Sequence, residues 1–189
     1  NLMALSTARV VTGRDKLLVF NEAYHGGVIK FPGGHCALNM PFDFVLADYN
    51  DIEGTAELID QVGDQLAAVL IEPILGAGGN IRGDRQFLEM LRQKTREYGI
   101  LLIFDEIKTA RLGSAGVQGM LGIAPDLTTL GKFIGGGLPT GAFGGSAEIM
   151  AQFNPRLPGA LAHAGTAGQI NKHDRCDDRC YADPGRLLH

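Results

Sequence analysis

The chain has 189 residues, of which 45% are hydrophobic and 20% are charged, and its formal net charge is −4. This balance is typical of a soluble globular domain and argues against a disordered chain or a basic nucleic-acid-binding face. No apolar run approaches the ~20 residues that span a bilayer, and three cysteines do not make a disulfide framework. We therefore expect a cytoplasmic protein with neither a membrane nor a nucleic acid as partner.

Short apolar runs alternate with a helical pattern along much of the chain. Three runs are bounded by polar or turn residues and predict strands, at 16–21, 67–73 and 100–105. Residues 84–99 predict a helix with one apolar face, capped by Asp84 and ended by Gly99. Because the strand runs are continuously apolar, we expect an α/β fold with a mostly parallel sheet and helices on both faces.

Acidic side chains at the ends of predicted strands are the first candidates for a site. Glu72 ends the apolar part of the second run, and Asp105 ends the third. Ligands of open α/β sheets bind outside the carboxyl ends of the strands, and a carboxylate buried there needs a partner. Each acid is therefore either a capping or salt-bridged structural group, or a carboxylate that faces a bound cation.

Lys132 differs from the other five lysines of the chain in its sequence setting. It follows an apolar stretch, LTTLG, and precedes three consecutive glycines at 135–137. A lysine removed from water has a depressed pKa, and its neutral amine can form a Schiff base. Lys108 is the nearest rival, but it has no such glycine setting. We expect the glycines to let the chain turn tightly around a buried Lys132, where Cβ atoms would collide.

A third motif, Tyr24-His25-Gly26-Gly27, places an aromatic ring beside a histidine and two glycines. Alone, this motif is more commonly a turn with a structural tyrosine. Together with a buried lysine and a strand-end aspartate, it indicates pyridoxal phosphate. That cofactor needs a lysine for its aldehyde and an acid for its pyridinium nitrogen, and its flat ring suits an aromatic neighbour.

Five stretches occur in order along residues 1–166: AYHGG, AAVLIEPILGAGG, LLIFDEIKTAR, PDLTTLGKFIGGGLPTGAFGG and PGALAHAGT. On these stretches the chain resembles the class III (ω-type) aminotransferases and the related glutamate-1-semialdehyde aminomutases, fold type I enzymes that use pyridoxal phosphate. The resemblance implies a fold type I large domain at 1–166. Residues 167–189 have many charges and little apolar periodicity, so we expect a divergent, poorly structured tail there.

The resemblance also implies roles for the matched residues. Lys132 corresponds to the Schiff-base lysine, and Asp105 to the partner of the pyridinium nitrogen. Tyr24 matches the aromatic residue that stacks on the cofactor ring, and His25 and Gly26 complete that motif.

Two further residues follow from the same resemblance. Glu72 matches the acid of the family's E-P motif, near the cofactor and the substrate. Thr166 matches the threonine that contacts the cofactor phosphate from the neighbouring subunit, so a homodimer is implied. The family's Ser-Gly-Thr phosphate loop lies just before the segment that matches 1–5, and a smaller C-terminal domain follows Thr166. The chain is therefore expected to be either a compact enzyme or a fragment of a longer one.

These observations lead us to expect a pyridoxal-phosphate-dependent aminotransferase that moves an amino group from an amine or amino acid to a keto or aldehyde acceptor. A glutamate-1-semialdehyde-type aminomutase fits the same stretches about as well. A non-catalytic fragment that binds the cofactor weakly or not at all is a third interpretation. His173, Cys176 and Cys180 offer a competing idea for the tail, a structural zinc site, but zinc normally has four ligands.

Overall fold

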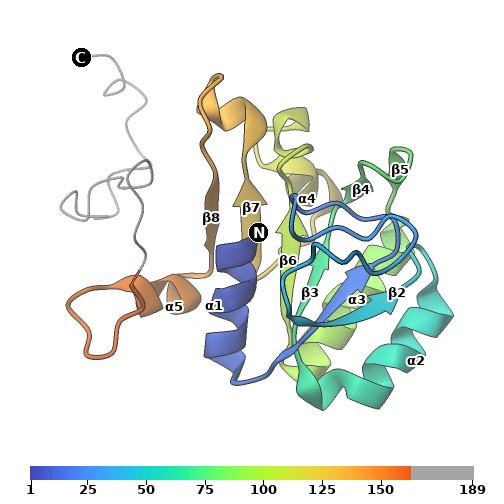
Figure 1. Ribbon diagram of the computed structural model, residues 1–189, viewed down its shortest axis with the longest axis horizontal. Coiled ribbons are helices and arrows are strands. Elements are labelled where there is room, and N and C mark those ends of the chain that lie inside the picture. Colours follow the sequence, from blue (N-terminus) through green and yellow to red (C-terminus); the bar gives the residue numbers. More distant parts are fainter. Residues whose placement is uncertain (163–189) are drawn as a thin grey trace.

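The computed structural model describes residues 1–162, and a six-stranded sheet lies at its centre (Figure 1). The strands are β1 (Lys16–Phe20), β2 (Asp43–Ala47), β3 (Leu66–Ile71), β6 (Leu101–Asp105), β7 (Leu127–Leu130) and β8 (Ala142–Gly145). They lie in the order β2-β1-β3-β6-β7-β8. Neighbouring strands are parallel from β2 to β7, and β8 runs antiparallel to β7 at the edge.

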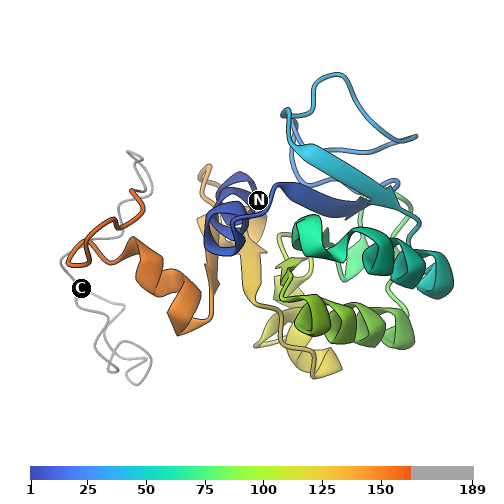
Figure 2. The ribbon, with the colours of Figure 1, turned by 90° about the horizontal axis from the view of Figure 1, so that it is seen from below.

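Helices cover both faces of this sheet. Figure 2 shows α1 (Leu2–Thr12) on one face and α2 (Ile52–Val62) with α3 (Arg85–Tyr98) on the other. The smaller elements are α4 (Gly116–Leu121), α5 (Ala147–Met150), the hairpin of β4 (Ile74–Leu75) and β5 (Ile81–Arg82), and 3-10 turns at Gly63–Gln65, Ala110–Leu112, Lys132–Gly135 and Ala151–Phe153. No helix within residues 1–162 is long and apolar enough to cross a membrane. The expected α/β fold with a mostly parallel sheet is confirmed.

The three predicted strands and the predicted helix all form, because their apolar side chains fill the core. Every residue of β3 is buried, as are four of the five residues in each of β1 and β6. From α3, the Phe87 ring packs edge-on to Phe20 with a centroid distance of 5.5 Å. Asp84 occupies the N-cap position of α3 without a capping hydrogen bond from its side chain, and Gly99 ends the helix in the left-handed conformation, with φ 63°.

The apolar runs do not predict β2, β8 or the β4–β5 hairpin. β2 lies at one edge of the sheet and includes an exposed and two half-buried residues. β8, at the other edge, contains two glycines and has no buried residue. Edge strands have fewer neighbours, so their sequences lack the continuous apolar pattern that marks a central strand.

The parallel strands bring the candidate residues to one edge of the sheet. Asp105 is the last residue of β6, and Glu72 directly follows β3. Tyr24 lies on the loop after β1, and Lys132 lies two residues after β7. Because the carboxyl ends of these strands meet at this edge, it is where a ligand is expected. The predicted domain boundary after residue 166 lies outside the described residues and stays a prediction.

Candidate active site

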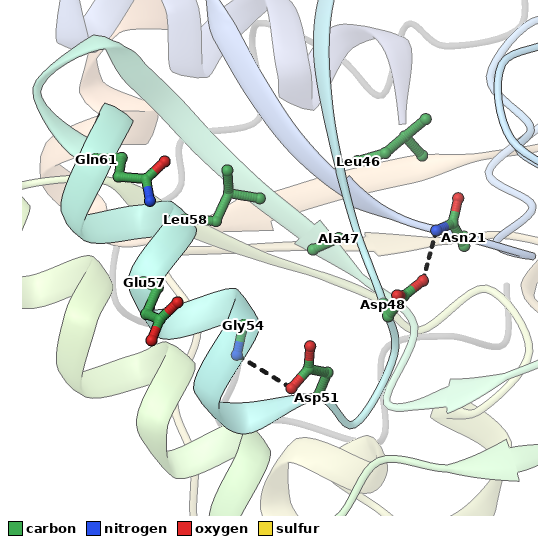
Figure 3. A pocket seen from close by; sticks show the side chains of 9 residues that line it. All are labelled: Asn21, Leu46, Ala47, Asp48, Asp51, Gly54, Glu57, Leu58 and Gln61. Atoms are coloured by element: carbon green, nitrogen blue, oxygen red, sulfur yellow. Dashed lines mark hydrogen bonds between the residues drawn. The ribbon is translucent and has the colours of Figure 1, made fainter.

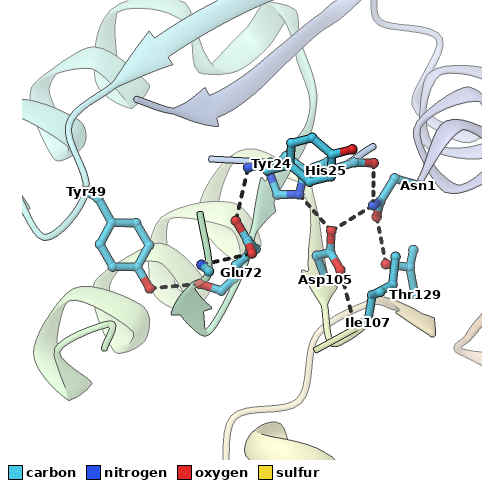
Figure 4. A network of polar contacts seen from close by, with 9 residues as sticks. Asn1, Tyr24, His25, Tyr49, Glu72, Asp105, Ile107 and Thr129 are labelled. Carbon is cyan, nitrogen blue, oxygen red and sulfur yellow. Dashed lines mark hydrogen bonds and ion pairs between the residues drawn. The ribbon is translucent and has the colours of Figure 1, made fainter. Parts of the chain in front are cut away.

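A hydrogen-bonded pair, Asp105 and His25, forms the centre of the site (Figure 4). Nδ1 of His25 lies 2.8 Å from Oδ2 of Asp105, and both side chains are almost completely buried. Asp105 ends β6, whereas His25 lies on the loop that follows β1. An ionised carboxylate only accepts hydrogen bonds, so Nδ1 of His25 is the donor.

Asn1 and Thr129 complete this network, and the sequence analysis missed both. The Asn1 amide nitrogen donates to Oδ2 of Asp105 at 2.7 Å and to the carbonyl oxygen of His25 at 2.8 Å. The Thr129 hydroxyl donates to the amide oxygen of Asn1 at 2.7 Å. Thr129 is paired with Asp105 in the register of β7 and β6. A polar residue inside an apolar strand run is the signal that could have identified it.

The neighbours of Asp105 keep its carboxyl group ionised. Burial by itself would raise the pKa of this group, but the hydrogen bond and charge of His25 oppose burial. The backbone N–H of Ile107, 3.1 Å from Oδ1, and the Asn1 amide act in the same direction as His25. The pKa of Asp105 is therefore below its ordinary value, and the buried carboxylate can pair with a cation at neutral pH.

Glu72 ties the loop after β1 to the end of β3. Its Oε2 accepts the backbone N–H of Tyr24, and its Oε1 accepts the backbone N–H of Gly76, both at 3.1 Å. Burial raises the pKa of the Glu72 carboxyl group. The structure thus brings Glu72 and Tyr24 together, and Glu72 holds its proton more firmly than an exposed glutamate would.

The Tyr24 ring is 46% exposed and is free to stack on a flat partner. The backbone beside it makes a tight turn, in which the Ile29 N–H donates to the Gly26 carbonyl oxygen at 3.1 Å. Gly26 has φ 127°, a conformation that residues with a side chain rarely adopt. Gly26 is therefore needed for the turn that orients Tyr24 and His25.

Lys132 lies at the same edge of the sheet but outside the hydrogen-bonded network. Gly131, its neighbour, packs against Ile107, the residue whose N–H binds Asp105: a Cβ at Gly131 would lie 3.4 Å from Cγ2 of Ile107. The Lys132 side chain is exposed, and no residue of the turn that it begins, Lys132–Gly135, is buried. The expectation of a buried Lys132 is therefore wrong for the described part of the chain.

The backbone around Lys132 explains the glycines that follow it. Lys132 has φ 51°, in the left-handed region that non-glycine residues enter at a cost, often at functional sites. Gly136 and Gly137 have φ 55° and 99°, yet nothing lies within 4 Å of the Cβ that either would carry. The expected collision of Cβ atoms is wrong at these two positions. The positive φ angles are what favour glycine there, whereas at Gly135 a Cβ would lie only 3.2 Å from Cβ of Thr140, as expected.

Several candidates of the sequence analysis lie outside the described residues. These are Thr166 and the three zinc-ligand candidates His173, Cys176 and Cys180. Residues 1–162 contain no cluster of three or more His, Cys, Asp or Glu that could hold a metal ion. The roles of Thr166 and of the tail stay predictions.

Two hollows in the described surface lie away from Asp105. One, of about 270 Å³, lies beside α2 and is lined by polar and acidic residues that include Asn21, Asp48, Asp51 and Glu57 (Figure 3). The other, of about 870 Å³, is mainly apolar and lies beside α4 and β7. Its lining includes Thr128 and Leu130, which alternate with Thr129 along β7 and so point to the opposite face of the sheet. Neither hollow contains a predicted site residue.

Comparison with known proteins decides the family. The family model described as aminotransferase class-III matches residues 2–168 of the chain. The chain belongs to the class-III aminotransferase family. The solved relatives described next confirm the fold type I architecture that the sequence motifs imply.

Three relatives illustrate the match. The β-phenylalanine transaminase of Variovorax paradoxus is 49% identical over 166 residues, covering 88% of this chain and 38% of that protein. Its crystal structure gives a TM-score of 0.86 at 48% identity, over 89% of this chain and 39% of that one. Glutamate-1-semialdehyde 2,1-aminomutase 2 of Halalkalibacterium halodurans is 44% identical over 180 residues, 87% of this chain and 42% of that protein. A solved transaminase with PLP bound is 31% identical, with a TM-score of 0.78 over 87% of this chain and 42% of that one.

This class-III aminotransferase chain spans about two fifths of the length of these relatives. The family binds pyridoxal phosphate, and the described residues fit that group on three counts. Oδ1 of Asp105 accepts one hydrogen bond, from Ile107, and so has capacity for a ring N–H. Lys132 forms no side-chain hydrogen bond or ion pair within residues 1–162, and the Tyr24 ring is exposed.

The lowered pKa of Asp105 predicts a pH-dependent contribution to stability. A carboxyl group with a depressed folded-state pKa stabilises the fold above its unfolded pKa of about 3.9, and this stabilisation is lost as the pH falls through the folded pKa. We expect the difference in unfolding free energy between the parent chain and Asp105→Asn to be larger at pH 7 than at pH 3. Urea unfolding followed by circular dichroism measures it.

Asp64→Asn, which removes an exposed carboxyl group, controls for the loss of one charge. A difference between the parent and Asp105→Asn that is the same at both pH values would contradict the assignment of Asp105 as a stabilised carboxylate.

Proposed function

We propose that the protein is a pyridoxal-phosphate-dependent aminotransferase that moves an amino group from an amine or amino acid to a keto or aldehyde acceptor. The observation that carries this proposal is the buried Asp105 carboxylate, which His25 and Asn1 hold ionised at the carboxyl edge of the sheet. Lys132 at the same edge and the transaminase relatives support it.

Each residue has a distinct task under this proposal. Pyridoxal phosphate, when bound, supplies an electron sink for the bonds at the substrate's Cα. The Lys132 amine would hold the cofactor aldehyde and would move the proton at the substrate's Cα, as general base and acid. Asp105 accepts a hydrogen bond from the ring nitrogen and so keeps that nitrogen protonated. Tyr24 stacks on the ring and fixes its plane.

Glu72 and Thr166 have supporting tasks. Glu72 holds the Tyr24 backbone N–H and so sets where the stacking ring lies. Its carboxyl group, with a raised pKa, borders the space beside the ring where a substrate would enter. Thr166, as the family resemblance implies, would contact the cofactor phosphate of the neighbouring subunit.

The identity of the substrate separates two candidate reactions. The 49% identity to a β-phenylalanine transaminase favours an amino acid or amine donor, whereas the 44% identity to a glutamate-1-semialdehyde aminomutase favours an internal exchange. A chain that binds the cofactor without turnover is the third possibility.

A donor panel distinguishes these reactions. We expect β-phenylalanine and related amines to bleach the cofactor's absorption in the absence of an acceptor, and pyruvate to restore it, because transamination proceeds through two separate half-reactions. Absorption spectra of the cofactor-loaded chain measure both steps. Turnover of glutamate-1-semialdehyde alone would favour the aminomutase, and a spectrum that no donor changes would favour the non-catalytic chain.

Removal of Lys132 tests the covalent role directly. We expect Lys132→Ala to lose the attachment of pyridoxal phosphate that borohydride makes permanent, because no other lysine within residues 1–162 follows a strand end with a positive φ. Lys108→Ala, the matched control, should retain the attachment. Mass spectrometry of the reduced intact chain measures it, and an unchanged adduct in Lys132→Ala would remove Lys132 from the mechanism.

We also propose that the active form is a homodimer. Three apolar side chains in or just after the turn that Lys132 begins are exposed: Phe133, Ile134 and Leu138. Monomers rarely expose large contiguous apolar patches. A two-fold interface would bury such residues and bring Thr166 of each chain to the other's cofactor. The molar mass measured by light scattering and the activity per chain should both fall on dilution. A monomer with full activity per chain at every concentration would contradict the proposal.

A further inference from the structure

The Asn1 amide makes three directed hydrogen bonds next to Asp105. Its nitrogen donates to Oδ2 of Asp105 and to the carbonyl oxygen of His25, and its oxygen accepts from the Thr129 hydroxyl (Figure 4). A side-chain amide has a donor end and an acceptor end, so a turn of 180° would place its oxygen against the carboxylate. The orientation of this amide therefore decides whether it attracts or repels Asp105.

Thr129 anchors the oxygen end of the Asn1 amide. It is fully buried on β7, beside Asp105 in the strand register. The Thr129 hydroxyl is the hydrogen-bond donor that the described residues present to the Asn1 oxygen. The Asp105 carboxylate and the His25 carbonyl oxygen only accept hydrogen bonds, so they require the NH₂ end of the amide, and the Thr129 hydroxyl then donates to its oxygen. Because Thr129 is buried in the sheet, its hydroxyl fixes where the oxygen end of the amide lies.

We propose that Thr129 is a positioning residue that anchors the Asn1 amide by its oxygen, holds the amide nitrogen against Asp105 and so fixes the orientation of that carboxylate. With the amide nitrogen and His25 both on Oδ2, the second oxygen of Asp105 keeps Ile107 as its donor and is left to receive a ring N–H. This inference rests on the proposed function only for the identity of that ring. The arrangement of Thr129, Asn1 and Asp105 holds without it.

The first test uses the unliganded full chain. The proton on Nδ1 of His25, which the Asp105 carboxylate binds, is observable by NMR in chain labelled with ¹⁵N-histidine, and loss of one signal in His25→Gln assigns it. Thr129→Val has almost the same shape but no hydroxyl. We expect it to shift or broaden this signal, because the freed amide no longer holds Asp105 and the His25 carbonyl in place. Thr129→Ser, which restores the hydroxyl, should restore the signal.

Thr128→Val is the matched control. Thr128 lies next to Thr129 on β7 but points to the opposite face, where its hydroxyl donates to Oε1 of Gln118 at 3.2 Å. The same substitution at this position should leave the His25 signal unchanged. An effect of Thr128→Val equal to that of Thr129→Val would mean that the strand, and not the hydroxyl, is responsible.

The second test measures the affinity for pyridoxal phosphate by equilibrium dialysis. Loss of one hydrogen bond that holds a charged group should weaken binding about tenfold in Thr129→Val. Asn1→Ala should do the same, and the double variant should be no weaker than Asn1→Ala, because Thr129 acts through Asn1. Should Thr129→Val not fold, Asn1→Ala alone must still shift the His25 signal.

The outcomes separate this inference from the proposed function. A His25 signal and an affinity that are unchanged in Thr129→Val, or additive losses in the double variant, would overturn the positioning role. If neither the parent nor any variant binds pyridoxal phosphate, the proposed function fails. The NMR signal of the unliganded chain then decides the role of Thr129 by itself.

Discussion

The burial of one carboxylate, that of Asp105, is the constraint on which the rest of the site depends. A buried charge is costly unless hydrogen bonds replace the water that it loses. Here His25, Asn1 and the backbone N–H of Ile107 supply those bonds. The carboxylate in turn fixes the ring of His25, the Asn1 amide and the loop after β6. Pairing Asp105 with a cationic ring would use the acceptor capacity that these donors leave free.

The topology of the sheet makes this network possible. The donors and acceptors come from positions far apart in the sequence: 80 residues separate His25 from Asp105, and 128 separate Asn1 from Thr129. A parallel sheet brings them together because all of its carboxyl ends lie at one edge. The site is therefore assembled only when β1, β3, β6 and β7 have paired, so folding of the sheet and formation of the site are coupled.

Much of the fold could be predicted from the sequence, because the central strands are continuous apolar runs and Asp84 and Gly99 bound the main helix. Asp105, Glu72 and Tyr24 were recognisable since they follow those runs or belong to a motif. The edge strands β2 and β8 were not recognisable, because strands with a neighbour on one side only lack the continuous apolar pattern of central strands. The burial of Lys132 could not be judged either. Apolar neighbours in the sequence indicate a buried strand, but not whether anything covers the turn that follows.

Thr129 and Asn1 show a different limit of sequence analysis. A threonine in a strand and an asparagine beside a helix each have a common structural explanation, and their shared hydrogen bond depends on strand register and on the position of α1. Short-range patterns carry no information about either. A polar residue in an apolar strand run marks Thr129 as a candidate, but its partner Asn1 is identified only when the hydrogen bonds around Asp105 are traced through the structure.

The central claim is that this edge of the sheet holds pyridoxal phosphate covalently at Lys132. The most direct measurement is to reduce the cofactor-loaded parent chain with borohydride, digest it and locate the phosphopyridoxyl group by mass spectrometry. The account predicts a single modified peptide that carries the group on Lys132. A group found on Lys108 or another lysine, or no modified peptide at all, would contradict it.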